Sequence, residues 1–420
     1  SISHRAIMLG GIASGRTVVH GLLEGEDVMA TIAALGAMGV EIDKLDNTWV
    51  IEGIGLENLK EPSRVLDMGN SGTSTRLLIG LVGGRPFTTF FTGDASLSRR
   101  PMGRVITPLE QMGASFLARE GGRLPLAVQG AEKPKAITYT LPVASAQVKS
   151  AILLAGLSAH GLTTVVEHVP TRDTTERMLR AFGASVEIEE NFLGGGHTIV
   201  LTGQPKLTGR DIIVPADISS AAFPLVAALL KIDSEVKLMN VGVNERRAGI
   251  IHSLKEMGAD LELLNERELC GEPVADILVR GGRVLKGITI MPERAPSMID
   301  EFPVLAMAAA CAKGTSHFKG LAELRVKESD RLTLVAQGLE ACGVKVEVEG
   351  DDLIIHGTGK LPEGGATIAT ALDHRIAMSF LVLGTVTAQP IRIDDGNPIA
   401  TSFPTFVALM NGLGAKVGEG

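Results

Sequence analysis

The chain has 420 residues and a formal net charge of −8 at pH 7, and only 3% of its residues are aromatic. A chain of this length buries a large core and divides into two or more domains. Because nucleic-acid-binding domains are usually basic and stack bases on aromatic side chains, this composition argues against that class. No uninterrupted apolar run reaches the length of a membrane span, and the first residues, Ser1–Arg5, do not resemble a signal peptide.

Six segments rich in Ser, Asn or Asp each stand directly before a run of Ala and Leu. These residue types cap helices by accepting hydrogen bonds from the first free backbone N–H groups, so each segment predicts a helix N-terminus. The six predicted helix starts are Ser1–Arg5, Asn70–Arg76, Ser145–Ser150, Asp217–Ala222, Asp300–Pro303 and Asp373–Met378. Simple capping explains the Asp217 segment equally well, whereas the others also carry charged or amide side chains that capping does not require.

Six glycines alternate with these helix starts, and each closes a segment with helical apolar periodicity. The glycines are Gly39, Gly113, Gly183, Gly258, Gly343 and Gly414, at spacings of 70 to 85 residues. Glycine tolerates the left-handed backbone conformation that commonly ends a helix. The near-constant spacing therefore predicts six repeats, each with a capped helix, strands joined by a turn, and a second helix.

Three repeats precede the segment 214–217 and three follow it, which predicts two similar domains, 1–215 and 216–420. Glycine clusters at Glu120–Arg123 and Gly194–Gly196 separate pairs of strand-like segments. Neither cluster both follows a buried strand and opens a helix, so we expect hairpin turns and not phosphate-binding loops. The three cysteines, Cys270, Cys311 and Cys342, are odd in number, and a reducing, cytoplasmic setting is the simplest interpretation.

Charged residues gather at the predicted helix starts and in the segments that lead to them. They include Arg100, Arg172, Arg375 and the run Arg325–Arg331. Helix N-termini favour anions, and arginine binds phosphate and carboxylate through paired hydrogen bonds. We therefore expect a pocket for a small polyanion, although any single one of these residues could lie on a solvated helix face. Within the run 325–331 we expect a helical turn with Lys327, Asp330 and Arg331 on one side and Glu328 paired with Arg331.

Several long motifs resemble one enzyme family. GNSGTSTR, DASLSRRPMGR, ASAQVKSAILLAGL, PSMIDEFPVL, ELRVKESDRL and LDHRIAMSF occur in the order found in the 5-enolpyruvylshikimate-3-phosphate synthase (EPSP synthase) family. The likeness covers essentially the whole chain and is closest to the bacterial class noted for glyphosate-tolerant members. It implies an α/β fold of two similar domains, each with three βαβαββ repeats (an inverse α/β barrel), and an active site in the cleft between them.

The resemblance also implies the reaction. The enolpyruvyl group of phosphoenolpyruvate moves to the 5-hydroxyl of shikimate 3-phosphate by addition and elimination, giving 5-enolpyruvylshikimate 3-phosphate and phosphate on the way to chorismate and aromatic amino acids. No metal or organic cofactor is needed. The implied partners are these two small substrates and the inhibitor glyphosate, with no nucleic acid and no membrane, for a monomeric cytoplasmic enzyme.

Matching the motifs residue by residue assigns the site. Asp300 is the base or its orienter, Glu328 is an acid/base near the methylene carbon, and Lys327 could share proton transfer, with the order of use left open. The residues implied for phosphoenolpyruvate or glyphosate are Asn70, Gly72, Thr73, Arg100, Gln147, Arg331 and Arg375. Those implied for shikimate 3-phosphate are Ser1, Arg5, Ser145, Ala146, Gln147, Arg172, Asp300 and Lys327. His374 is expected to be structural.

Three positions depart from the family pattern. The family places a lysine, a ligand of phosphoenolpyruvate, directly before the residue equivalent to Ser1, so we expect an N-terminal segment with that lysine and a first strand to be missing from this sequence. Its loss could lower the rate about 100- to 1000-fold. Thr401 stands where some members have a further lysine. Gly72 stands where glyphosate-tolerant members can have alanine. The absence of a methyl group at this position favours glyphosate binding here.

Two alternatives remain at this point. The related UDP-N-acetylglucosamine enolpyruvyl transferases generally carry a reactive cysteine in the loop that corresponds to Asp94–Pro101, and this loop has none. The second alternative is an inactive protein of the same fold that only binds anions. The presence of Asp300, Lys327 and Glu328 together argues against it.

Overall fold

The computed structural model describes residues 2–191, 195–269 and 271–418. The chain forms two compact units. The first comprises Ser1–Pro215 with Leu269–Glu272, and the second comprises Ala216–Glu268 with Pro273–Gly420. Of the residues singled out in the sequence, Ser1, Gly194 and Cys270 lie outside the described part.

The first unit contains six α-helices and twelve strands among its described residues. The helices are α1 (Ile2–Ile12), α2 (Glu26–Ala37), α3 (Gly72–Gly83), α4 (Gly103–Gln111), α5 (Ala146–Gly156) and α6 (Thr174–Ala181). The strands are β1 (Ser14–His20), β2 (Glu41–Leu45), β3 (Thr48–Ile54), β4 (Leu66–Asp67), β5 (Thr88–Thr92), β6 (Ser115–Arg119), β7 (Arg123–Gln129), β8 (Thr138–Thr140), β9 (Leu162–Glu167), β10 (Val186–Glu190), β11 (His197–Thr202) and β12 (Asp211–Ile213).

Three four-stranded sheets of one pattern surround this unit's helices. Their strand orders are β12-β1-β3-β2, β4-β5-β7-β6 and β8-β9-β11-β10. In each sheet the first two strands are parallel and the remaining pairs are antiparallel. The first sheet includes a strand that is distant in the sequence. This strand, β12, follows the third repeat and pairs with β1, with Val18 opposite Asp211.

The second unit follows a similar order of elements, but two of its three sheets have fewer strands. Its helices are α7 (Ile218–Leu230), α8 (Gly249–Glu256), α9 (Phe302–Cys311), α10 (Arg331–Ala341), α11 (His374–Gly384) and α12 (Phe406–Gly412). Its strands are β13 (Glu235–Gly242), β14 (Asp260–Leu269), β15 (Glu272–Arg280), β16 (Thr289–Ile290), β17 (Lys313–Phe318), β18 (Lys345–Glu349), β19 (Asp352–Thr358), β20 (Thr367–Ile368) and β21 (Arg392–Ile393). They form sheets β13-β15-β14, β16-β17-β19-β18 and β20-β21.

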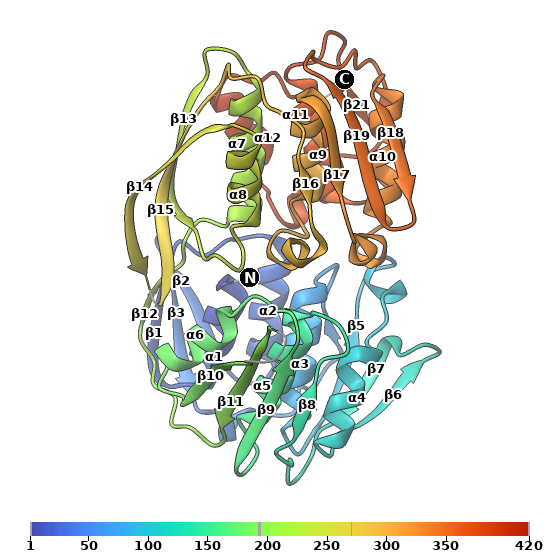
Figure 1. Ribbon diagram of the computed structural model, residues 1–420. Helices are drawn as coiled ribbons and strands as arrows, with labels where there is room; N and C mark the ends of the chain where they lie inside the picture. Colours follow the sequence, from blue (N-terminus) through green and yellow to red (C-terminus); the bar gives the residue numbers. More distant parts are fainter. Residues whose placement is uncertain (1, 192–194, 270, 419–420) are drawn as a thin grey trace. The chain divides into compact units, whose positions relative to one another are not determined.

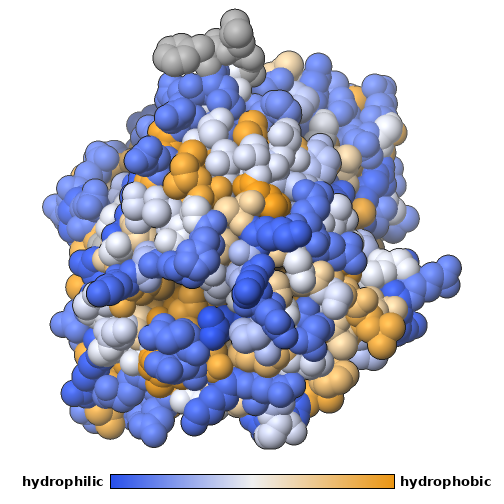
Figure 2. Space-filling view, turned by 90° about the horizontal axis from the view of Figure 1, so that it is seen from below, coloured by the Kyte–Doolittle hydropathy of each residue, from blue (hydrophilic) through white to orange (hydrophobic). Residues whose placement is uncertain are grey.

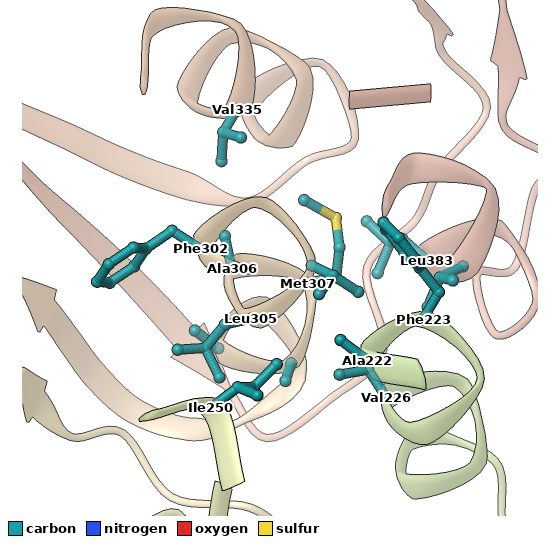
Figure 3. Close-up of a cluster of buried hydrophobic side chains, with 14 of the residues drawn as sticks. Ala222, Phe223, Val226, Ile250, Phe302, Leu305, Ala306, Met307, Val335 and Leu383 are labelled. Atoms are coloured by element: carbon teal, nitrogen blue, oxygen red, sulfur yellow. The ribbon is translucent and has the colours of Figure 1, made fainter. Parts of the chain in front are cut away.

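Three helices of each unit are buried on nearly all sides. In the second unit α7, α9 and α11 lie side by side and pack against one another (Figure 1). The sequence of α9, FPVLAMAAAC, is apolar all round, which is the composition of a helix enclosed by other elements. Figure 3 shows Phe223 and Val226 of α7, Met307 of α9 and Leu383 of α11 meeting in this core.

The six predicted helix ends and four of the six predicted helix starts are confirmed. The N-cap of α9 is Glu301 and not Asp300, without a side-chain capping bond, and Ser1 lies outside the described residues. Ser71, Ser145, Asp217 and Asp373 are N-cap residues whose side chains accept backbone N–H bonds at the starts of α3, α5, α7 and α11. All six helix-closing glycines have positive φ values, between 83° and 105°. The repeated pairs of helices are present, but the predicted order within a repeat is wrong. A single strand separates the two helices, and the strand hairpin follows the glycine, as β6 and β7 follow Gly113.

The surface is ordinary for a folded chain of this composition. Figure 2 shows one face on which hydrophilic residues predominate and hydrophobic residues lie between them in small groups. Single large apolar side chains such as Leu117 and Ile232 are exposed, which is normal for folded proteins. None of the described helices is both long enough and apolar enough to cross a membrane.

Candidate functional site

The N-termini of α3 and α5 in the first unit are joined by side chains predicted to bind ligand. Gln147, in the first turn of α5, accepts a bond from Nη1 of Arg76 at 2.9 Å. Its Nε2 donates to Oγ1 of Thr73 at 3.0 Å. Ser145 caps α5, and Ala146 is its first residue. The structure thus brings Thr73, Ser145, Ala146 and Gln147 together where two helices present backbone N–H groups, an arrangement that suits an anion.

Arg100 lies beside the start of α3. Its Nη2 donates to Oδ1 of Asn70 at 2.6 Å, and Nδ2 of Asn70 donates to Oδ2 of Asp94 at 2.6 Å. A Cβ added to Gly72 would lie 2.8 Å from Nη1 of Arg100 and 3.0 Å from Nη1 of Arg76. Glycine at this position therefore lets two guanidinium groups converge on the first residue of α3.

Arg5, on the first turn of α1, is buried with 6% of its surface exposed. Its Nε donates to Oγ1 of Thr175 at 2.6 Å, and its Nη2 donates to Oγ of Ser150 at 2.8 Å. Arg172 is partly exposed in the segment between β9 and α6. The position of Ser1, which was predicted beside Arg5, lies outside the described residues.

The second unit gathers carboxylates and cations around one buried arginine. Nη1 of Arg331 lies 3.2 Å from Oδ1 of Asp300, and Nζ of Lys327 lies 3.1 Å from the same oxygen. Arg331 also donates through Nη2 to Glu328 and through Nε to Oδ2 of Asp373, at 2.8 Å in the second case. The Arg331 side chain is 1% exposed, whereas Asp300, Lys327 and Glu328 are each partly open to solvent. All three predicted catalytic residues therefore lie together.

The electrostatics of this cluster follow from burial and pairing. Burial alone would lower the pKa of Arg331, but Asp373, Glu328 and Asp300 together raise it above its usual value. Burial alone would raise the pKa of Asp373, but the adjacent Arg331 holds that pKa below its usual value. Both groups therefore stay charged at neutral pH, and the arginine orients the carboxylates around it.

Arg375 and His374 open α11. Nη1 of Arg375 donates to the backbone oxygen of Asp300 at 3.2 Å and lies 4.0 Å from Oε1 of Glu301. Burial lowers the pKa of His374 to about 4, although the neighbouring Asp373 opposes this shift. The imidazole is therefore neutral at pH 7.

One expectation about the run 325–331 is wrong. A 3₁₀ turn covers Ala322–Val326, α10 begins only at Arg331, and Lys327 and Asp330 do not share a helical turn with it. Asp330 is instead the N-cap of α10, where its side chain accepts the backbone N–H of Thr333 at 3.1 Å. An aspartate that can cap the following helix competes with continuation of the preceding turn. The predicted contact between Glu328 and Arg331 forms nevertheless.

A second group of linked side chains in this unit includes residues that were not among the predicted site residues. Arg247 donates through Nη2 to Oδ1 of Asp217 at 2.8 Å and to Oγ of Ser219 at 3.2 Å, and Ser219 donates to Glu301. These contacts join the start of α7 to the residue before α9. The capping pattern at Asp217 was visible in the sequence, but Arg247 stands in an ordinary charged segment and carried no signal. Within residues 2–191, 195–269 and 271–418, no group of three His, Cys, Asp or Glu side chains is placed to hold a metal ion.

The two units, each with three buried helices and repeated α/β elements, form the inverse α/β barrel fold of the enolpyruvyl transferases. The fold is shared with the enolpyruvyl transferase NikO from Streptomyces tendae, at a TM-score of 0.74 and 17% sequence identity, over 99% of this chain and 92% of that one. At that identity the likeness concerns the fold alone.

Closer matches define the family. The family model of EPSP synthase (3-phosphoshikimate 1-carboxyvinyltransferase) matches residues 1–410. The chain is 60% identical over 418 residues to the 3-phosphoshikimate 1-carboxyvinyltransferase of Paramagnetospirillum magneticum, covering 99% of this chain and 93% of the relative. The Rhodospirillum rubrum enzyme is 58% identical, over 99% of this chain and 93% of its own. The structure of EPSP synthase from Acinetobacter baumannii matches with a TM-score of 0.87 and 50% identity, over 99% and 94%. The chain belongs to the EPSP synthase family.

Proposed function

We propose that the two groups of residues described above carry out different parts of the family reaction. That reaction transfers the enolpyruvyl group of phosphoenolpyruvate to the 5-hydroxyl of shikimate 3-phosphate and releases phosphate. The observation that carries the proposal is the placement of Asp300, whose Oδ1 lies 3.1 Å from Lys327 and 3.2 Å from Arg331. A carboxylate held by two cations and still partly exposed is fixed in orientation and open to a substrate.

In this scheme Asp300 accepts the proton of the 5-hydroxyl as that oxygen bonds to the central carbon of phosphoenolpyruvate. Glu328 delivers a proton to the methylene carbon during addition and takes one back as phosphate leaves during elimination. Lys327 lies beside Asp300 and can share either transfer. Positioned general acids and bases of this kind typically contribute about 100- to 10,000-fold to a rate.

The cations bind the two substrates. We assign Arg100 and Arg375, with Asn70, Gly72 and Thr73 at the start of α3, to the phosphate and carboxylate of phosphoenolpyruvate. Arg331 pairs with three carboxylates and is almost fully buried, so its part is mainly to orient Asp300 and Glu328. For shikimate 3-phosphate we assign Arg5, Ser145, Ala146 and Arg172, together with Ser1, Asp300 and Lys327, and we assign Gln147 to both substrates.

Three finer features belong to the same proposal. The chain acts as a monomer in the cytoplasm, and glyphosate binds in place of phosphoenolpyruvate. The support for glyphosate binding is Gly72, which leaves space beside Arg100 and Arg76 that a methyl group would fill. Cytoplasmic location is supported by Cys311 and Cys342, which are free thiols.

Phosphate release from phosphoenolpyruvate in the presence of shikimate 3-phosphate tests the catalytic roles. Asp300→Asn and Glu328→Gln should each lower kcat by about 100-fold or more. Binding of shikimate 3-phosphate, measured by isothermal titration, should survive in Glu328→Gln. Glu349→Gln, an exposed position at the end of β18, is the matched control and should change neither quantity. Near-normal kcat in both site variants would refute the assignment.

The wild-type assay should be run on the 420-residue chain and on a version preceded by a segment that ends in lysine. Activity only in the extended version would show that the added segment is required. Equal activity in both would show that it is dispensable. Binding of shikimate 3-phosphate without turnover in either version would favour the anion-binding alternative and overturn the proposed catalysis.

A further inference from the structure

The first unit contains a fully buried cluster of charged side chains next in sequence to residues that contact Arg5. Nζ of Lys149 on α5 lies 3.1 Å from Oε2 of Glu167 at the end of β9 and 2.8 Å from Oε1 of Glu176 on α6. The side chains are 0%, 1% and 0% exposed in that order. None of the three is among the residues assigned to substrate or catalysis above.

The burial of three ionisable side chains has an energetic cost that helix packing alone does not explain. Buried ions lose their hydration, and replacing a buried ion group by apolar side chains of similar volume is often neutral or stabilising. Apolar side chains fill most of this unit's core, including Ile152 and Leu153 on the same helix. Simple cohesion of α5 with α6 would therefore not require a lysine and two glutamates.

The sequence neighbours of the cluster point to a positioning role. Ser150 follows Lys149 and Thr175 precedes Glu176, and the two hydroxyl oxygens lie 2.7 Å apart. These are the same hydroxyls that accept the two bonds from Arg5. The ion pair between Lys149 and Glu176 thus fixes the spacing of α5 and α6 at the point where both helices hold Arg5.

Lys149 also fixes the segment that carries Arg172. Both ends of 167–176 are tied to its ammonium group, through Glu167 and through Glu176. Within this segment, Thr171 donates from Oγ1 to Oε2 of Glu167 at 2.7 Å. Arg172 is the next residue, so its backbone is held from both sides.

The charges agree with this role. Lys149 and Arg5 bring two positive charges into the buried region, and Glu167 and Glu176 bring two negative ones. Asp173, 3% exposed in the same segment, adds a further negative charge, and His197 Nδ1 lies 4.0 Å from Oε1 of Glu167. Of these groups only Arg5 belongs to the residues assigned to ligand.

We propose that Lys149 is a positioning residue which, through Glu176 and Glu167, sets the geometry of Arg5 and Arg172 and so the affinity for shikimate 3-phosphate. This inference rests on the proposed function, because it takes Arg5 and Arg172 as ligands of that substrate. Lys149 itself does not touch the substrate. Its effect should therefore fall on one substrate and not on the chemical step.

The test compares Lys149→Met and Glu176→Gln with the unmodified chain. Methionine keeps the length of the side chain without its charge, and Glu176→Gln keeps the pair of Lys149 with Glu167. We expect the Kd for shikimate 3-phosphate, measured by titration, to rise at least tenfold in Lys149→Met and about threefold in Glu176→Gln. The KM for phosphoenolpyruvate and kcat at saturating shikimate 3-phosphate should change less than threefold, measured in whichever of the two chain versions releases phosphate.

Controls separate this inference from general damage. Glu187→Gln, an exposed position on β10, should leave the Kd unchanged. If Lys149→Met does not fold, Glu176→Gln alone decides, because it leaves one buried ion pair intact. Equal weakening of both substrates together with a lowered melting temperature would indicate a merely structural role and overturn the inference.

Arg5→Ala distinguishes the two levels of the proposal. If Arg5→Ala abolishes binding of shikimate 3-phosphate while Lys149→Met and Glu176→Gln bind normally, the positioning role is refuted and the proposed function stands. If Arg5→Ala itself binds normally, the assignment of the substrate residues is wrong. Tenfold weaker binding in both Arg5→Ala and Lys149→Met supports both.

Discussion

At the scale of single residues, the lack of a side chain at Gly72, in the first turn of α3, determines where the neighbouring arginines can lie. Guanidinium nitrogens of both Arg100 and Arg76 lie within 3.0 Å of the position that a Cβ on Gly72 would take. These atoms are the far ends of flexible side chains. A substitution would therefore move the cations and leave the backbone in place.

Gly72→Ala should accordingly change binding more than folding. We expect the KM for phosphoenolpyruvate to rise several-fold and the inhibition constant for glyphosate to rise more, because Arg100 and Arg76 must both shift. Steady-state kinetics with glyphosate measure the two effects. The control is Gly103→Ala, at the start of α4, where an added Cβ meets nothing within 4 Å. Unchanged sensitivity to glyphosate in Gly72→Ala would contradict this steric explanation.

Asp373 is a buried charge whose loss removes one of the three carboxylates that pair with the buried Arg331. Its Oδ2 accepts bonds from Arg331 at 2.8 Å and from Ser329 at 2.9 Å. Asp373→Asn should lower the free energy of unfolding by about 3–5 kcal/mol, the usual cost of breaking one partner out of a buried pair. Urea unfolding measures this cost. Asp351→Asn, which removes an exposed partner of Arg325, should cost at most about 1 kcal/mol.

The same carboxylate gives a pH dependence of known sign. Since the folded state lowers the pKa of Asp373 below its usual value of 3.8, the unfolded chain binds the proton more readily. The stabilisation by Asp373 is therefore complete above pH 3.8 and is lost as the pH falls through the lower folded value. The stability difference between the unmodified chain and Asp373→Asn should be constant at neutral pH and shrink in acid. A difference that grows in acid would contradict the assignment.

At the scale of elements, some of the glycines that end the helices are needed only for their left-handed backbone conformation and not for lack of space. Gly258, after α8, has φ of 89°, and an added Cβ there would meet nothing within 4 Å. Gly258→Ala should therefore cost about 1–2 kcal/mol purely through left-handed strain. Gly36→Ala, inside α2 and equally unobstructed, should stabilise by about 0.5–1 kcal/mol. Denaturant unfolding of both variants checks the opposite signs, and equal effects would show that the strain is absent.

The elements also show where local pattern suffices. Capping residues and terminal glycines act on their own helix, so the starts of α3, α5, α7 and α11 and the six helix ends could be predicted. The segment 325–331 could not, because two outcomes compete locally there. Its charges fit one helical turn as well as a 3₁₀ turn followed by a cap, and the capping bond of Asp330 decides in favour of the second.

At the scale of the whole molecule, each unit has its own hydrophobic core. One core holds Leu153 of α5 and the other holds Leu305 of α9, and the two clusters of buried residues share no member. We expect the units to unfold as separate cooperative blocks, with a calorimetric enthalpy larger than the van 't Hoff enthalpy.

Core substitutions test this independence. Leu305→Ala should destabilise the second unit by about 2–5 kcal/mol and leave the first unit's transition in place, and Leu153→Ala should do the reverse. Scanning calorimetry, with hydrogen exchange to assign each transition, separates the two. One transition that moves as a whole in both variants would show that the molecule unfolds as a single block.

The sequence by itself determined the repeats, the helix ends, the α/β class and the family, because each of these rests on short segments whose residues act locally or match as motifs. It also placed Asp300, Lys327, Glu328 and Arg331 in one group through the family motifs. Only the tertiary structure decided which charged side chains from distant parts of the sequence pair with one another. Asp373 pairs with Arg331 from another helix, Arg247 reaches Asp217, and Lys149 meets two glutamates from separate elements. Such pairs lie 18 to 42 residues apart, and only the packing of the helices brings them within hydrogen-bond distance.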